Sequence, residues 1–169
     1  MDASLPELSH YLYPGGIFAD PRPHRVTTIL GSCVAVCLWD PVCRVGGINH
    51  YLLPLWNGEG LPTPRYGNVA IDLLVERLLI FGCSRGRLTA KFFGGAAMWE
   101  NSNGLLSVGE RNIDLARRSL ERHRIPVVGA DVGGEAGRKI IFDTGSGSVL
   151  LRRTRSGQDI GRPATATGR

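Results

Sequence analysis

Residues 27–54 read TTILGSCVAVCLWDPVCRVGGINHYLLP and carry the clearest structural signal in the chain. Two apolar, β-branched runs lie on either side of Asp40-Pro41, and this dipeptide suits the first two positions of a type I turn. The pattern predicts a β-hairpin whose turn occupies residues 40–43. A bulge at the Gly46-Gly47 pair is the alternative that would shift the register of this hairpin.

Further strand and helix patterns lie on both sides of the hairpin. Short apolar segments bounded by Gly or Pro are typical of strands, and they occur at residues 26–30, 33–39, 45–53, 88–93, 125–132, 138–142 and 147–151. Residues 68–82 and 107–124 have apolar side chains at helical spacing. The second of these segments begins with Ser107 three positions before Glu110, a capping-box spacing. Because several strands are joined by links too short for a crossover helix, we expect an α+β fold with a largely antiparallel sheet and two main amphipathic helices.

The composition is that of an ordinary globular chain. Its 169 residues are 43% hydrophobic and 21% charged, which excludes a disordered chain and a mini-protein held together by disulfides. We expect one domain over residues 1–151. Residues 152–169 contain no aliphatic run, which predicts a flexible basic tail.

The net charge of +5 is concentrated near the C-terminal end. Residues 152–169 contain five arginines and one aspartate, so residues 1–151 are nearly neutral. This distribution argues against a nucleic-acid-binding domain, which needs a basic surface on its folded part. The sequence has no long apolar segment and no secretory signal pattern, so we expect a soluble, cytoplasmic protein without stable membrane insertion.

The four cysteines, Cys33, Cys37, Cys43 and Cys83, are candidate core thiols, metal ligands or a nucleophile in a reducing cytosol. In a regular strand Cys33 and Cys37 share a face but lie about 13 Å apart, too far to bind one metal ion. Their spacing also lacks the Cys-x-x-Cys arrangement common in zinc sites. We therefore expect no metal and no cofactor.

Cys33 and His50 are the candidate catalytic pair. With the turn at residues 40–43 they lie directly opposite each other, with Cβ atoms about 5 Å apart. An imidazole at that distance can take the thiol proton and generate a nucleophilic thiolate. A buried thiol and a core histidine without chemical roles fit the same spacing. The residue that would orient the imidazole is one of four nearby polar residues, Thr27, Thr28, Ser32 and Asn49.

Six segments resemble, in their order and spacing, the CheD family of bacterial chemotaxis proteins: LGSCVAVCLWDP (30–41), GGINHYLLP (46–54), RYGNVAIDLL (65–74), AKFFGGAAM (90–98), GERNI (109–113) and DVGGEAGRKIIFDTGSG (131–147). The resemblance runs from about Tyr13 to Leu151. The chain has Gly16 where the family often has an acidic residue, Ile48 where it often has Met, and Asn68 where it often has Asp. The family fold that the resemblance implies is a layered α/β sandwich.

The resemblance also implies a function and a site. Members of the CheD family are chemoreceptor glutamine deamidases, and their catalytic Cys, His and His-orienting Thr fall on Cys33, His50 and Thr27. On this basis we expect Cys33 to attack the side-chain carboxamide of a receptor glutamine and form a thioester. Hydrolysis of glutamyl methyl esters is expected as a related reaction. Ser32 and Asn49 are expected near the oxyanion or the substrate.

The partners implied by the resemblance are helices of methyl-accepting chemotaxis receptors and the phosphatase CheC. An alternative function is therefore a regulatory binding module for CheC with little catalytic activity. A third hypothesis, a nucleic-acid binder, requires a basic folded surface, which the nearly neutral residues 1–151 do not predict.

Overall fold

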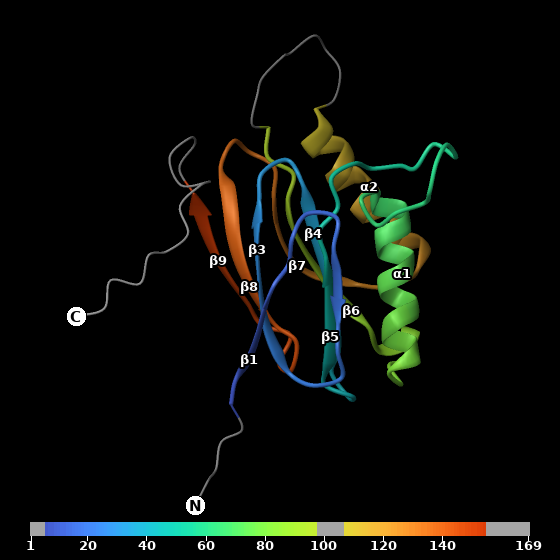
Figure 1. Cartoon of the computed structure of the whole chain (residues 1–169), viewed down its shortest axis with the longest axis vertical. Coiled ribbons are helices and arrows are strands. Elements are labelled where there is room, and N and C mark those ends of the chain that lie inside the picture. The colour runs from blue at the N-terminus through green and yellow to red at the C-terminus, as the bar shows by residue number, and fades with distance from the viewer. Residues whose placement is uncertain (1–5, 98–106, 155–169) are drawn as a thin grey trace, which may run out of the picture.

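The computed structural model describes residues 6–97 and 107–154. Within these residues the chain forms three layers (Figure 1). Two β-sheets pack face to face, and two helices cover the outer face of one of them. The α+β fold and the layered sandwich expected from the sequence are confirmed.

The two sheets have four and five strands. The first sheet contains β1 (Leu8–Tyr11), β3 (His24–Leu30), β8 (Gly137–Asp143) and β9 (Val149–Thr154), in that order. The second contains, in order, β2 (Ile17–Ala19), β5 (Val45–Asn49), β4 (Val34–Asp40), β6 (Thr89–Gly94) and β7 (Val127–Val132). The helices are α1 (Gly67–Ile80), α2 (Val108–Arg122) and the short 3-10 turn η1 (Arg85–Arg87).

Most neighbouring strands run antiparallel, as the short links predict. Among the described strands, the parallel pairs are β1 with β3 and β6 with β7. The other pairs of neighbouring strands are antiparallel, namely β2 with β5, β3 with β8, β4 with β5, β4 with β6, and β8 with β9. The prediction of a largely antiparallel arrangement is therefore confirmed.

Strand β4 lies inside the molecule and contributes to both layers of the core. Val34, Val36 and Leu38 pack in the cluster that includes α1 and α2, whereas Ala35 and Cys37 pack in the cluster between the two sheets. This alternation follows from the two-residue period of a strand. All five side chains are at most 2% exposed. Burial on both faces explains why this strand reads as an uninterrupted apolar run in the sequence.

The start of α2 and the end of α1 lie within two residues of the boundaries that the sequence predicts. The Ser107 hydroxyl accepts a hydrogen bond from the Glu110 N–H at 3.2 Å and caps α2. At the end of α1, Gly82 has a φ of 90°. The N–H groups of Gly82 and Cys83 donate to the Leu79 and Leu78 carbonyls, both at 3.1 Å. These two bonds form a Schellman motif, which stops the helix.

The structure also contains two strands that the sequence patterns miss. Strands β1 and β2 have four and three residues, and none of these residues is fully buried. They therefore lack the alternation that marks a longer strand. At the other end of the chain, β9 continues to Thr154, beyond the expected domain boundary at residue 151. Residues 155–169 of the expected tail lie outside the described residues.

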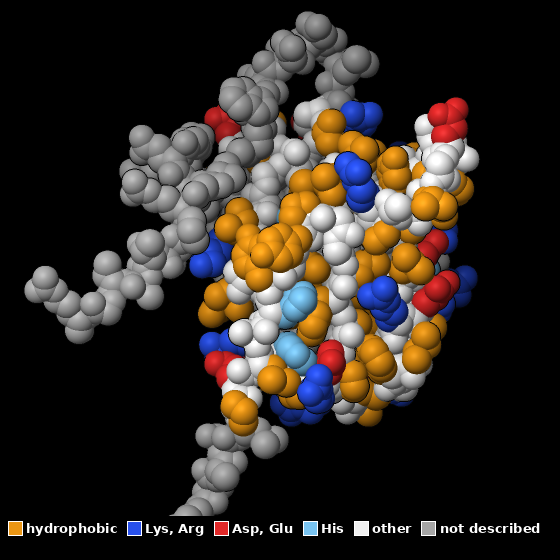
Figure 2. Space-filling view, in the orientation of Figure 1, with side chains coloured by type: hydrophobic (Ala, Val, Ile, Leu, Met, Phe, Trp, Pro, Cys, Tyr) orange, Lys and Arg blue, Asp and Glu red, His pale blue; other side chains and the backbone are white. Residues whose placement is uncertain are grey.

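Two features of the described surface bear on the class of partner. No helix among residues 6–97 and 107–154 is long and apolar enough to cross a membrane. On the face shown in Figure 2, Lys and Arg side chains are scattered among acidic and apolar ones. The described part of this face therefore lacks the continuous basic stripe that nucleic-acid binders use.

Candidate active site

Cys33 lies where the chain crosses from the first sheet to the second. Residues 31–33 connect the end of β3 to the start of β4, and Cys33 is half-buried. The carbonyls of Gly31 and Cys33 accept hydrogen bonds from the N–H groups of Ala96 and Gly95, both at 2.9 Å. These bonds hold the crossover against the loop after β6. The Cys33 side chain packs against the apolar cluster between the sheets.

The Gly94-Gly95 pair is required for this close approach. Both residues have positive φ angles, 109° and 69°, a region that favours glycine. A side chain on Gly94 would collide with the Cys33 carbonyl oxygen, and one on Gly95 would collide with Ile113 of α2. Gly94 therefore lets β6 lie against the backbone of the candidate nucleophile, and Gly95 lets α2 pack against the loop after β6.

His50 follows the last residue of β5, and a loop from the N-terminal part of the chain holds its backbone. The His50 N–H donates to the Gly16 carbonyl at 3.1 Å, and the His50 carbonyl accepts from the Gly15 N–H at 2.8 Å. The His50 side chain is 1% exposed. These two bonds fix the backbone of His50, from which the imidazole projects.

The hairpin register differs from the predicted one by two residues. Asp40 pairs with Val45, and an isolated bridge pairs Val34 with Tyr51. The turn occupies residues 41–44 instead of 40–43, because the Arg44 N–H donates to the Asp40 carbonyl at 2.8 Å and Arg44 adopts a φ of 56°. The prediction that Cys33 lies directly opposite His50 is therefore wrong.

Cys33 and His50 nevertheless point to the same side of the second sheet. In the observed register Cys33 lies opposite Leu52, and His50 lies two residues from that position. Since side chains alternate with a period of two, a shift of two residues keeps them on one face, as diagonal neighbours. Diagonal residues are about 7–8 Å apart in an antiparallel pair. Both side chains face the first sheet, as their neighbours Ala35 and Ile48 do.

Thr28 determines the tautomer of His50. The Thr28 hydroxyl donates to the Leu12 carbonyl at 2.8 Å, and its Oγ1 lies 2.7 Å from His50 Nδ1. Because the hydroxyl proton is already used, Oγ1 accepts from Nδ1, and the ring proton resides there. The other nitrogen, Nε2, then carries a free lone pair. It is buried and has no hydrogen-bond partner among the described residues.

Burial keeps both candidate groups uncharged at neutral pH. It lowers the pKa of His50 from 6.5 to about 4. Burial also raises the pKa of the Cys33 thiol, and the hydrogen bond from the Cys33 backbone N–H offsets part of that effect. The resting pair is therefore a thiol and a neutral imidazole, and the imidazole can accept a proton through Nε2.

The other predicted site residues are not all near His50. Thr27, the residue that the family resemblance implied for orienting the imidazole, lies between the buried Val26 and Thr28 and points to the other face of β3. The hydroxyl at His50 belongs to Thr28 instead. Ser32 directly precedes Cys33 in the crossover.

Asn49 also points away from the pair. Its Oδ1 accepts a hydrogen bond from the Val36 N–H at 2.9 Å, which replaces a ladder bond between β4 and β5. Asn49 alternates with His50 and shares the face of Gly47, whose missing side chain would collide with Leu74 of α1. Asn49 therefore lies on the helix side of the sheet and supports the strand pairing.

Asn112 is a site residue that sequence reasoning missed. It lies in α2 at 0% exposure, and its Nδ2 donates to the carbonyls of Ser32 and Leu52, both at 3.0 Å. The backbone carbonyl of Asn112 accepts from the Tyr51 hydroxyl at 2.6 Å. Asn112 thus joins the segment before Cys33 to the segment after His50. A buried amide within an amphipathic helix was the available signal, because buried polar groups require specific partners.

The backbone around Cys33 supplies potential donors to a reacting carbonyl. Within the described residues, no backbone carbonyl accepts from the N–H group of Ser32 or of Cys33, and the Cys33 N–H donates toward its own thiol. Unpaired backbone N–H groups beside a nucleophile can stabilise the negative oxygen of a tetrahedral intermediate. Ser32 therefore places a backbone N–H next to Cys33.

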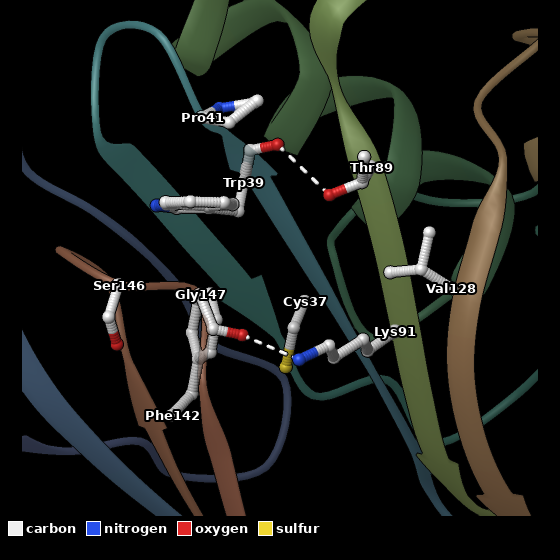
Figure 3. A pocket seen from close by; sticks show the side chains of 9 residues that line it. All are labelled: Cys37, Trp39, Pro41, Thr89, Lys91, Val128, Phe142, Ser146 and Gly147. Atoms are coloured by element: carbon white, nitrogen blue, oxygen red, sulfur yellow. Dashed lines mark hydrogen bonds between the residues drawn. The ribbon is translucent and has the colours of Figure 1, made fainter.

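A separate cavity of about 290 Å³ lies between the sheets near the β4–β5 turn (Figure 3). Cys37, Trp39, Lys91 and Phe142 are among its lining residues, and neither Cys33 nor His50 lines it. Lys91 Nζ donates to the Gly147 carbonyl at 2.9 Å. Burial raises the pKa of the Cys37 thiol and keeps it protonated. Cys37 is therefore a core residue rather than a second nucleophile.

The fold places a half-buried thiol, Cys33, and a buried imidazole, His50, on one face of the second sheet, and a thiol and an imidazole base are the two groups that cysteine-dependent hydrolases use. A family model described as CheD chemotactic sensory transduction matches residues 52–153. The chain belongs to the CheD family.

Three similar proteins extend the match beyond that region. The chain is 51% identical over 148 residues to a probable chemoreceptor glutamine deamidase CheD of Trichlorobacter lovleyi, covering 88% of this chain and 92% of that protein. It is 47% identical over 144 residues to the protein of that name in Sulfurimonas denitrificans, and the alignment covers 84% of this chain and 92% of that protein. A protein of Anaeromyxobacter dehalogenans, probable chemoreceptor glutamine deamidase CheD 1, is 47% identical over 143 residues. This alignment covers 85% of the present chain and 83% of that protein. An alignment of 148 residues within a chain of 169 necessarily spans Cys33 and His50.

Proposed function

We propose that this chain is a chemoreceptor glutamine deamidase with Cys33 as nucleophile and His50 as general base. Relatives that are 51% and 47% identical carry the name probable chemoreceptor glutamine deamidase. The single observation that carries the residue assignment is the buried Nε2 of His50, which has no hydrogen-bond partner in residues 6–97 and 107–154 and lies on the same sheet face as Cys33.

The reaction begins with a proton transfer. The Cys33 thiol gives its proton to His50 Nε2, and the thiolate attacks the side-chain carboxamide carbon of a receptor glutamine. The carbonyl π bond opens, and its oxygen takes the negative charge within reach of the Ser32 and Cys33 N–H groups. His50 then protonates the nitrogen, the carbon–nitrogen bond breaks, and ammonia leaves. The product of this half-reaction is a thioester at Cys33.

Water completes the cycle. His50 takes a proton from a water molecule, and the resulting hydroxide attacks the thioester carbon. The carbon–sulfur bond breaks, the thiolate recovers a proton from His50, and the receptor side chain leaves as glutamate. Throughout both steps Thr28 keeps the ring proton on Nδ1, so that Nε2 remains the nitrogen that exchanges protons. Thr28 is thus proposed as the positioning residue in place of Thr27.

The proposal also covers how the substrate reaches the enzyme, where the enzyme acts and which partner it binds. A receptor glutamine lies on a protein surface, so the reaction requires that surface to reach the half-buried Cys33. We place the enzyme in the cytoplasm, with the deamidase domain ending at β9 and CheC as a further partner. The alternative of a CheC-binding module with little activity is not favoured, because the relatives are named for deamidation.

The test uses the full chain and purified cytoplasmic fragments of chemoreceptors. Peptide mapping by mass spectrometry should show conversion of specific glutamines to glutamate, with one ammonia released for each conversion. Addition of purified CheC then shows whether this partner binds and changes turnover. The absence of both conversion and ammonia with every receptor fragment, from a chain that is folded by circular dichroism, would contradict the proposal.

A further inference from the structure

Cys43 and Cys83 form a second thiol pair at the far end of the second sheet. Cys43 lies in the turn between β4 and β5, and Cys83 directly follows the end of α1. Strand β4 separates this turn from Cys33 by seven residues, or about 23 Å at 3.3 Å per residue. The pair is therefore distinct from the proposed active site.

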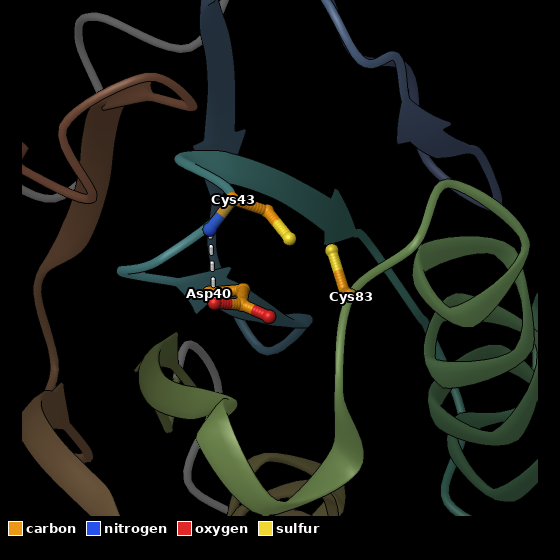
Figure 4. Close-up of side chains that lie close together, drawn as sticks. All are labelled: Asp40, Cys43 and Cys83. Atoms are coloured by element: carbon orange, nitrogen blue, oxygen red, sulfur yellow. Dashed lines mark hydrogen bonds between the residues drawn. The ribbon is translucent and has the colours of Figure 1, made fainter.

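The two sulfur atoms face each other. The Cys43 and Cys83 Sγ atoms lie within 4.8 Å of one another, and Figure 4 shows both side chains pointing into the space between them. Cys43 is half-buried, whereas Cys83 is 6% exposed. Burial, followed by the nearby Asp40 and Cys43, raises the pKa of the Cys83 thiol to about 11. Solvent therefore reaches the pair through Cys43.

Asp40 holds the two cysteine-bearing segments together. Its Oδ1 accepts from the Cys43 N–H at 3.2 Å, and its Oδ2 accepts from the Ser84 N–H at 2.9 Å. The Cys43 thiol also donates to the Gly82 carbonyl at 3.3 Å. The backbones on either side of the sulfur pair are thus fixed relative to one another.

A metal ion does not fit between these groups. Asp40, Cys43 and Cys83 have the ligand types and proximity of a metal cluster. However, the Asp40 carboxylate already accepts from the Arg87 guanidinium, with Nη2 at 3.0 Å from Oδ2. The same Nη2 donates to Cys43 Sγ at 3.4 Å. A guanidinium cation therefore takes the place and the charge that a metal would need.

We propose that Cys43 and Cys83 are an oxidation site that forms a disulfide with a hydroperoxide as oxidant. The Cys43 sulfur, as a thiolate, attacks one peroxide oxygen, the oxygen–oxygen bond breaks, and a sulfenic acid forms with release of water after proton uptake. The Cys83 sulfur then attacks the Cys43 sulfur, a sulfur–sulfur bond forms, and the sulfenic oxygen leaves as a second water. In sum, two thiols are oxidised and one hydrogen peroxide is reduced to two waters.

The bridge would constrain the core of the molecule. It would enclose β5 and α1 in a closed loop between residues 43 and 83, and cross-linking such a loop lowers the entropy of the unfolded chain. We expect the oxidised chain to melt about 5 °C or more above the reduced chain. A reductant such as dithiothreitol should reverse the shift.

The experiment uses the full chain carrying Cys33→Ala, so that its outcome does not depend on the deamidase proposal. The reduced protein is treated with a stoichiometric amount of hydrogen peroxide, its free thiols are alkylated, and its peptides are mapped by mass spectrometry. We expect a Cys43–Cys83 cross-linked peptide, two hydrogens lighter than the reduced pair, together with the higher melting temperature.

Two single variants serve as matched controls. Cys43→Ser and Cys83→Ser should each lose the cross-link and the melting shift, while circular dichroism under reducing conditions shows that both are folded. If the native pair instead remains open to alkylation, or if Cys43 proceeds to sulfinic acid while Cys83 stays a free thiol, the proposal is overturned. A bridge from either cysteine to Cys37 would overturn it equally.

Discussion

At the scale of single residues, one proton position determines what the site can do. Thr28 Oγ1 accepts from His50 Nδ1 because its own proton goes to the Leu12 carbonyl. This leaves the buried Nε2 as a base without a competing partner among the described residues. In the proposed mechanism this hydroxyl has the role that a carboxylate or amide has in catalytic triads.

Thr28→Val removes this hydroxyl while keeping the shape of the side chain. Loss of one such hydrogen bond is worth about 1 kcal/mol, so we expect kcat to fall about fivefold with little change in KM. Thr27→Val is the matched control, because Thr27 points to the other face of β3, and its kcat should stay at the wild-type level. Steady-state kinetics of ammonia release measure both. A larger loss in the Thr27 variant would return the orienting role to Thr27.

The choice between these two threonines shows where sequence reasoning ends. Spacing and resemblance predicted Cys33 and His50 as the catalytic pair, and the structure places both on one sheet face. Adjacent threonines on a strand point in opposite directions, so a one-residue difference decides which hydroxyl meets the imidazole. Which of the two side chains faces His50 depends on how the first sheet packs against the second. Local sequence patterns carry no information on that packing.

The pH dependence of the reaction follows from the neutral imidazole. A base must be unprotonated to act, and burial lowers the pKa of His50 from 6.5 to about 4. We therefore expect the acid limb of kcat/KM to fall near pH 4 and the rate to be flat at pH 6. Ammonia release measured across this range, with circular dichroism to follow folding, tests the prediction. A half-maximal rate near pH 6.5 would show an imidazole exposed to water.

At the scale of elements, the β4–β5 hairpin and α2 together form the site. The hairpin itself could be predicted from Asp40-Pro41 and its flanking apolar runs. Its register could not, because it depends on whether Arg44 adopts a positive φ and lengthens the turn. The observed shift of two residues preserved the face shared by Cys33 and His50, whereas a shift of one would have separated them.

A substitution of Asn112 tests whether α2 connects the two segments that carry Cys33 and His50. Asn112→Leu removes the two hydrogen bonds to the Ser32 and Leu52 carbonyls and leaves them without a donor. We expect unfolding free energy to fall by about 1–3 kcal/mol, and kcat to fall while KM changes little, because the two halves of the site lose their connection. Asp114→Ala, on the exposed side of the same helix, should change neither quantity appreciably. Equal kinetic effects in both variants would show that only general helix stability matters.

At the scale of the whole molecule, Arg138 ties the two sheets together. It lies in β8 of the first sheet with 2% exposure. Its guanidinium donates to Asp131 of the second sheet at 2.7 Å and to the Gly133 carbonyl at 2.8 Å. It also reaches the carbonyl of Gly94, the residue that packs against Cys33. This contact between the two sheets thus holds the backbone that packs against Cys33.

Arg138→Met should destabilise the fold, since it leaves a buried set of acceptors without their donor. We expect a loss of about 2 kcal/mol in urea unfolding. Arg153→Ala removes the other partner of Asp131, an arginine that is 63% exposed, and should cost less than about 0.5 kcal/mol. Similar losses in the two variants would mean that the Asp131 charge matters but the buried position of Arg138 does not.

The central claim is that the Cys33 thiol carries out the chemistry. Its most direct measurement is the rate of glutamine-to-glutamate conversion in a receptor fragment, followed by peptide mapping, for the wild-type chain and for Cys33→Ala. We predict that the variant folds as the wild type does and loses at least about 10³-fold in rate. Conversion by Cys33→Ala at a rate within about tenfold of the wild type would contradict the account.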